Sequence, residues 1–136
     1  MTALLRFIKH YLIPVVIGII IGGFVNYTLI YLSNSFVPEG VDPSDLESIK
    51  ANIHRYTPFH LLFPFLAHAF GTFTGAFVTL KLSQSSSAIT AYVIGVFFMI
   101  GGIMMVVQLP APMWFSIVDL GIAYLPMALI ATKIAR

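Results

Sequence analysis

Short polar stretches divide this chain into four long apolar segments. The apolar segments cover about residues 11–33, 58–81, 88–108 and 113–134. Each is close to the roughly 20 residues that an α-helix needs to cross the hydrocarbon of a bilayer. The pattern therefore predicts an all-α polytopic membrane protein, a single membrane domain over residues 1–136 that forms a bundle of four transmembrane helices.

Composition indicates the same class of protein. Hydrophobic residues make up 59% of the chain and charged residues 9%, and the mean hydropathy is +0.96, values far from those of soluble domains. The absence of cysteine excludes disulfides and thiol chemistry. We expect the lipid bilayer as the surroundings of this protein, with no cofactor and no nucleic-acid partner.

Basic residues predict how the bundle is oriented. Five of them fall on one side, at the two ends of the chain and after the second segment: Arg6, Lys9, Lys81, Lys133 and Arg136. The other side carries two basic residues, both in the first loop. Because positively charged loops stay in the cytoplasm, both termini are predicted to be cytoplasmic and the first loop periplasmic or extracellular.

The first loop contains a predicted short amphipathic helix over about residues 43–56. Asp42 is a candidate N-cap, because it precedes a proline that suits the first helical position. The apolar residues recur at steps of three and four and form one stripe: Leu46, Ile49, Ile53 and Tyr56. Such a helix either covers an outer opening as a lid or rests in the headgroups as a connector, and we favour the connector.

Glycines predict which helices pack together. Gly18 and Gly22 share one face of the first segment, and Gly71 and Gly75 share one face of the second. Since lipid supplies no hydrophobic force between helices, the close approach that glycine permits is a main source of packing energy. We expect these two faces to meet within one chain. A self-associating dimer face is the rival interpretation.

Asp119 is the one acidic residue that lies inside a predicted span. A charge at the bilayer centre costs roughly 2.5–3.5 kcal/mol on insertion scales, so such a residue usually faces the protein interior and has a partner. His68 and Asn26 lie at a similar depth on other spans, and Ser116 shares the face of Asp119. We expect Asp119 to contact His68, directly or through water, with Asn26 as a second candidate and His60 on the same stripe as His68.

An Asp119–His68 contact has two interpretations. It would form a proton relay, because histidine titrates near neutral pH, or it would hold the helices in register with a neutral carboxyl group. Pro64 and Pro126 remove backbone donors inside their helices and predict kinks. His60 and His68 are too far apart on a regular helix to share one metal ion, about 12 Å along the axis, so no metal site is expected.

Residues 64–81, the segment LPAPMWF at 109–115 and Asp119 resemble an uncharacterised group of small four-helix bacterial inner-membrane proteins. The resemblance implies a bacterial inner membrane and nothing about mechanism. Small multidrug transporters have a similar size, but they carry an acidic residue in the first helix that this chain lacks.

Three functions fit these residues. A homo-oligomeric transporter or channel for a small cation, a proton or a small solute would use Asp119 and His68. A non-catalytic accessory or assembly subunit of a larger membrane complex would use the glycine faces and the first loop. A lipid-acting enzyme is the third, and it is disfavoured because neither a nucleophile nor a phosphate-binding group accompanies the pair.

Overall fold

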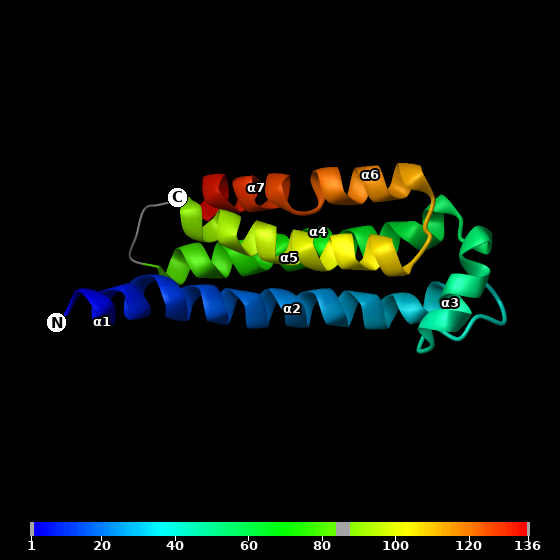
Figure 1. The fold of residues 1–136 in the computed structure, drawn as a ribbon, viewed down its shortest axis with the longest axis horizontal. Helices are drawn as coiled ribbons and strands as arrows, with labels where there is room; N and C mark the ends of the chain where they lie inside the picture. Colours follow the sequence, from blue (N-terminus) through cyan, green and yellow to red (C-terminus); the bar gives the residue numbers. More distant parts are fainter. Residues whose placement is uncertain (1, 84–87, 136) are drawn as a thin grey trace.

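The computed structural model describes residues 2–83 and 88–135 (Figure 1). Every regular element in these two ranges is a helix. Four helical stretches are long and apolar enough to cross a bilayer: Ala3–Phe36, Pro58–Leu82, Ile89–Gln108 and Met113–Ala135. They run along the long axis of the bundle, with the two ends of the chain at one end and the short helix α3 (Leu46–Asn52) at the other (Figure 1).

The first long stretch begins well before residue 11, where the apolar pattern placed it. It consists of four consecutive helical segments: α1 (Ala3–Phe7), a π-helical segment (Ile8–Leu12), α2 (Ile13–Ser33) and a 3₁₀ turn (Asn34–Phe36). Its start is set by Thr2, whose hydroxyl accepts a hydrogen bond of 3.3 Å from the backbone N–H of Leu5. The apolar pattern indicates where lipid would begin, whereas the cap decides where the helix begins.

The π-helical segment directly precedes α2, in which Pro14 is the second residue. Proline has no N–H, so the carbonyl of His10 loses its normal donor one turn earlier. The hydroxyl of Ser83, at the end of α4 (Pro58–Leu82), donates to that carbonyl at 2.7 Å. A side chain from the neighbouring helix therefore satisfies the carbonyl that the proline leaves free.

The second and third spans agree with their predicted limits to within one residue, as α4 and α5 (Ile89–Gln108). At the start of α4, the Thr57 N–H donates to Nδ1 of His60 at 3.0 Å. Pro64 lies within α4 without ending it. Serine is a preferred helix cap, and the three serines before the third span, Ser85, Ser86 and Ser87, lie outside the described residues.

The fourth span is broken, which corrects the single helix predicted over 113–134. It consists of α6 (Met113–Ile122) and α7 (Leu125–Ala135), separated at Ala123 and Tyr124 (Figure 1). Pro126 cannot donate to the carbonyl four residues before it, so the helix loses a bond at this point. We expected Pro126 to cause a kink, and the structure has a break that leaves Tyr124 almost fully buried.

Glycines form the contact between α2 and α4. A Cβ atom added at Gly22 would lie 2.5 Å from the carbonyl oxygen of Gly71, and one added at Gly75 would lie 2.8 Å from the carbonyl oxygen of Gly18. The backbones are therefore too close for any side chain between them. Each glycine face is occupied by the other within one chain, so neither face is free to form the dimer contact of the rival interpretation.

Helix α3 begins at Leu46, three residues after the predicted start. The side chain of Asp45 caps it by accepting a 3.0 Å hydrogen bond from the N–H of Glu47. The carboxylate of Asp42 instead accepts bonds from the hydroxyl and the N–H of Ser44, which lower the pKa of Asp42. The expected cap therefore forms a turn that precedes the helix.

Candidate functional site

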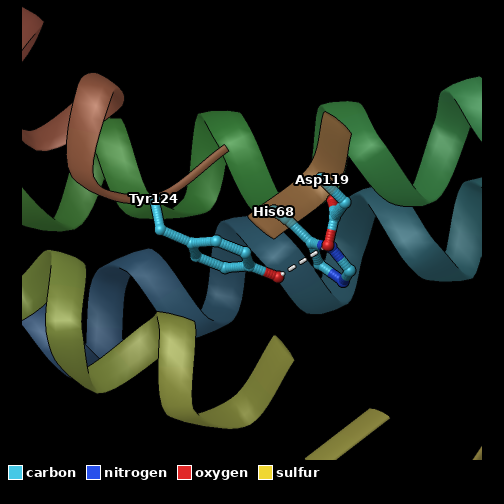
Figure 2. Close-up of polar contacts among 3 residues, drawn as sticks. All are labelled: His68, Asp119 and Tyr124. Carbon is cyan, nitrogen blue, oxygen red and sulfur yellow. Dashed lines mark hydrogen bonds and ion pairs between the residues drawn. The ribbon is translucent and has the colours of Figure 1, made fainter. Parts of the chain in front are cut away.

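Asp119, His68 and Tyr124 form one buried polar cluster (Figure 2). Nδ1 of His68 lies 2.9 Å from Oδ1 and 3.0 Å from Oδ2 of Asp119. The hydroxyl of Tyr124 donates to Oδ2 of Asp119 at 3.0 Å. The side chain of Asp119 is 3% exposed and that of His68 is 18% exposed, so the carboxyl group is almost fully buried and the imidazole is partly accessible. The direct contact between Asp119 and His68 is the one that we expected from their depths.

Three elements bring these side chains together. His68 lies in the middle of α4, Asp119 lies in α6, and Tyr124 lies in the break between α6 and α7. The break directs the Tyr124 ring back over the cluster, where it stacks on the His68 ring with centroids 5.7 Å apart (Figure 2). Gly102 of α5 makes room for it, since a Cβ at that position would overlap the Tyr124 hydroxyl. The broken helix therefore supplies a third member of the site.

The cluster can hold a shared proton in two positions. When Asp119 is ionised it can only accept hydrogen bonds, so Nδ1 of His68 must carry the hydrogen. When Asp119 is protonated, its hydroxyl donates to a bare Nδ1. Among the described residues no group hydrogen-bonds the other ring nitrogen, Nε2. His68 can therefore accept a second proton at Nε2 without breaking its bond to Asp119.

A cavity of about 180 Å³ lies between the cluster and α3. Asp119, His68 and Ser116 contribute to its walls from α6 and α4. On the opposite side the cavity is lined by the apolar stripe of the first loop: Ile49, Ile53 and Tyr56. Three of the four stripe residues therefore face a cavity in the protein, which favours the lid interpretation over the connector.

A second cavity, of about 190 Å³, lies between α2 and α5. Its walls include Asn26, Tyr124 and His68, and two exposed residues of α5, Gly101 and Met105, line it as well. It therefore reaches the flank of the bundle, whereas the first cavity lies at the α3 end. Three residues line both cavities, His68, Gly102 and Met105, and His68 is the polar one among them.

The other candidate residues lie around this cluster without bonding to it. The side-chain oxygen of Asn26 is buried, and no described residue forms a hydrogen bond with it, so Asn26 is not the partner of Asp119. His60 lines the first cavity, but its Nδ1 binds the start of α4. Ser116 lines the same cavity, and no hydrogen bond in the described ranges joins it to His68. Pro64 lines it one turn before His68.

Tyr124 and Gly102 are site residues that sequence reasoning missed. Tyr124 is five positions after Asp119, so a regular helix would place their side chains on different faces. The break in the fourth span removes that restriction, and Pro126 was the signal that a break was near. Gly102 belongs to a mainly apolar helix, in which no neighbouring polar residue indicated a contact with Tyr124.

Neither a search for a metal site nor comparison with known proteins assigns a further role to these residues. Among the described residues no group of three histidine, cysteine, aspartate or glutamate side chains could hold a metal ion. Comparison of the chain with protein-family models, with curated proteins and with solved structures found no match. The description of this chain as a helical bundle with four possible membrane spans and a buried polar cluster therefore rests on its own sequence and structure.

Replacing Tyr124 with phenylalanine is expected to destabilise the fold. The variant keeps the ring and removes the donor to Oδ2 of Asp119, and a hydrogen bond to a charged group contributes about 1.5–3 kcal/mol. Thermal unfolding in detergent measures the loss. Tyr27, 66% exposed on α2, is the matched control, because Tyr27→Phe removes a hydroxyl that contacts no buried acid. Equal stability of the two variants would contradict the assigned role of Tyr124.

Proposed function

We propose that this protein spans a bacterial inner membrane with four helices and moves protons, alone or coupled to a small solute, through the pair His68–Asp119. Both termini are cytoplasmic, and α3 and the acidic first loop face the periplasm. The observation that carries the proposal is an almost fully buried carboxyl group bonded to a partly accessible imidazole that lines two cavities.

The exterior of the bundle supports a lipid environment. Large apolar side chains are exposed on every long helix, including Phe24 at 69%, Val107 at 81% and Ile117 at 65%. Soluble monomers rarely expose contiguous apolar areas of this kind, whereas a bilayer solvates them. The polar cluster lies inside the bundle, as expected for ionisable groups in a membrane.

The charges at the two ends support the orientation. Arg6, Lys9, Lys81 and Lys133 lie at the end of the bundle that holds the termini, and Nζ of Lys81 donates to the carbonyl of Ala135 at 2.9 Å. The end that holds α3 carries the four acidic residues of the first loop. Positive charge at the ends of the chain matches a cytoplasmic location for that side.

The geometry favours a relay over a structural pin, a lipid-acting enzyme and an accessory subunit. A structural pin needs a bonded carboxyl group, but it does not need an imidazole that lines two cavities and has a free nitrogen. An acid–base enzyme acting through a serine would need a nucleophile bonded to His68, and Ser116 forms no such bond in the described chain. The accessory-subunit function predicts tolerance of changes at His68, which an activity measurement can detect.

Replacing His68 with glutamine is expected to stop proton movement. Purified protein in liposomes with an imposed pH gradient would be followed with an internal pH-sensitive dye, and the wild type should dissipate the gradient faster than protein-free liposomes. Glutamine can still hydrogen-bond Asp119 but does not titrate. The variant should therefore assemble and give the protein-free rate.

The matched control is His54→Gln, which removes an exposed histidine of the first loop. It should retain the wild-type rate. A wild-type protein no faster than empty liposomes, with and without a solute gradient, would overturn the proposed function. A His68→Gln variant with unchanged flux would overturn the role of the pair.

A further inference from the structure

The cavity beneath α3 has the walls of a small-molecule site. Most of its lining is apolar or aromatic, including Phe36 and Phe115 on its sides and Ile53 on its α3 side. The polar side chains in the lining come from several elements: Ser33, Asn34, Tyr56, His60, His68, Ser116 and Asp119. A concave apolar pocket with a few convergent polar groups is the usual form of a ligand site. Its volume of about 180 Å³ compares with about 150 Å³ for a protein cavity that binds benzene.

The charges around the cavity select the kind of ligand. Its titratable wall residues are Tyr56 from the segment after α3, His60 and His68 from α4, and Asp119 from α6. Tyr124 contacts Asp119 from behind, and α2 and α5 contribute no titratable wall residue. Among the described residues no lysine or arginine lines the cavity, so an anionic ligand would find no permanently charged partner and would lie close to the Asp119 carboxylate. The one acidic group is Asp119, and aromatic faces also attract cations.

We infer that this cavity binds a small, mainly apolar molecule that carries one protonated amine, and that binding of the amine at Asp119 displaces a proton from His68. The inference rests on the proposed function and names the substrate class of the same site. The carboxylate offers about four lone-pair positions, and His68 and Tyr124 use part of them. An ammonium group can therefore bond to Asp119 while both protein partners stay in place.

The exchange balances in charge and in protons. In the proton-loaded state an imidazolium at His68 faces the Asp119 carboxylate, and the pair is neutral overall. When the ammonium group of the ligand bonds to Asp119, His68 releases the proton on Nε2 to water and becomes neutral, and the site is neutral again. One cation enters as one proton leaves. No covalent bond forms or breaks, apart from the N–H bond of the released proton.

A matched ligand series tests the inference on the purified full chain in detergent. Phenethylamine, phenethyl alcohol and hydrocinnamate share a one-ring skeleton and differ in charge. Calorimetry should show the amine binding most tightly, the alcohol more weakly and the carboxylate not at all. Titrations in buffers of different protonation enthalpy should show one proton released per amine bound. Lowering the pH should weaken amine binding, because a higher proton concentration opposes release of the proton that the amine displaces.

Two variants separate the charge from the cavity. Asp119→Asn should weaken amine binding by about ten- to a hundredfold, the range expected for a lost charged hydrogen bond, and leave alcohol binding unchanged. Ile49→Trp places a larger side chain on the α3 wall, does not touch Asp119, and should weaken both ligands.

Equal binding of all three ligands, or amine binding without proton release, would overturn the inference. So would a wild type that binds none of them. The flux assay with His68→Gln contains no amine, so it tests the proposed function separately. Proton flux that depends on His68, together with no preference for the amine in calorimetry, would overturn this inference and leave the proposed function standing. Amine binding that depends on Asp119 but releases no proton would instead show a ligand site separate from any relay.

Discussion

Replacing Asp119 with asparagine is expected to leave a folded protein that moves no protons. Asparagine has the same shape, its oxygen can accept the bond from the Tyr124 hydroxyl, and its amide can donate to a bare Nδ1 of His68. It cannot bind or release a proton. Flux in liposomes should therefore fall to the rate of protein-free liposomes, while thermal unfolding in detergent stays close to that of the wild type.

Asp119→Leu is the companion variant, because it removes the hydrogen bonds together with the charge. It leaves the Tyr124 hydroxyl and the imidazole of His68 buried without their partner, and removing one member of a buried pair costs about 3–5 kcal/mol. The leucine variant should unfold at a clearly lower temperature than the asparagine variant. Flux through Asp119→Asn at the wild-type rate would show that Asp119 acts only as a structural pin.

Replacing Gly22 with alanine is the second change with a large expected effect. The added Cβ would lie 2.5 Å from the carbonyl oxygen of Gly71 and 3.0 Å from both Cα of Gly75 and Cε2 of Phe98. Two of these atoms belong to the α4 backbone, so α2 and α4 must move apart. Overpacking of this kind costs about 1–3 kcal/mol, and thermal unfolding in detergent should show it.

The neighbouring residue gives the control. A Cβ at Gly23 would meet no atom within 4 Å, so Gly23→Ala adds a better helix former without a clash. It should be neutral or stabilising, with an upper limit of about 1 kcal/mol. Equal destabilisation by the two alanines would contradict the α2–α4 contact. If Gly22→Ala changed the oligomeric state in light scattering and left monomer stability unaltered, the glycines would serve association between chains.

The four long apolar helices and their pairing could be predicted because a lipid environment would impose simple requirements on length and packing. Stretches of about 20 apolar residues needed no tertiary information, and the glycines at 18, 22, 71 and 75 predicted a close helix pair by their spacing. The ends of the helices were harder to predict from the sequence. The start at Ala3 depends on the Thr2 cap, and the start at Leu46 depends on which of two aspartates caps α3.

The site was predictable in its two main residues and not in its third. Asp119 and His68 were found because each is anomalous in apolar sequence at a similar depth. Tyr124 reaches Asp119 only because the fourth span breaks, and a proline in a membrane helix does not reveal how far the backbone departs from a helix. The sequence also did not reveal what the apolar stripe of α3 packs against, because the spacing of its residues is the same whether the helix rests on lipid or on a cavity.

The central claim is that His68 and Asp119 carry a mobile proton in the membrane. Solid-state NMR of the protein in lipid bilayers can follow the ring nitrogens of His68 and the carboxyl carbon of Asp119 as the pH changes across about 5 to 8, the range in which histidine titrates. We predict that the His68 ring signals change with pH, that the Asp119 signal changes with them, and that Asp119→Asn shifts the His68 transition. A pair whose signals stay constant across this range would contradict the claim.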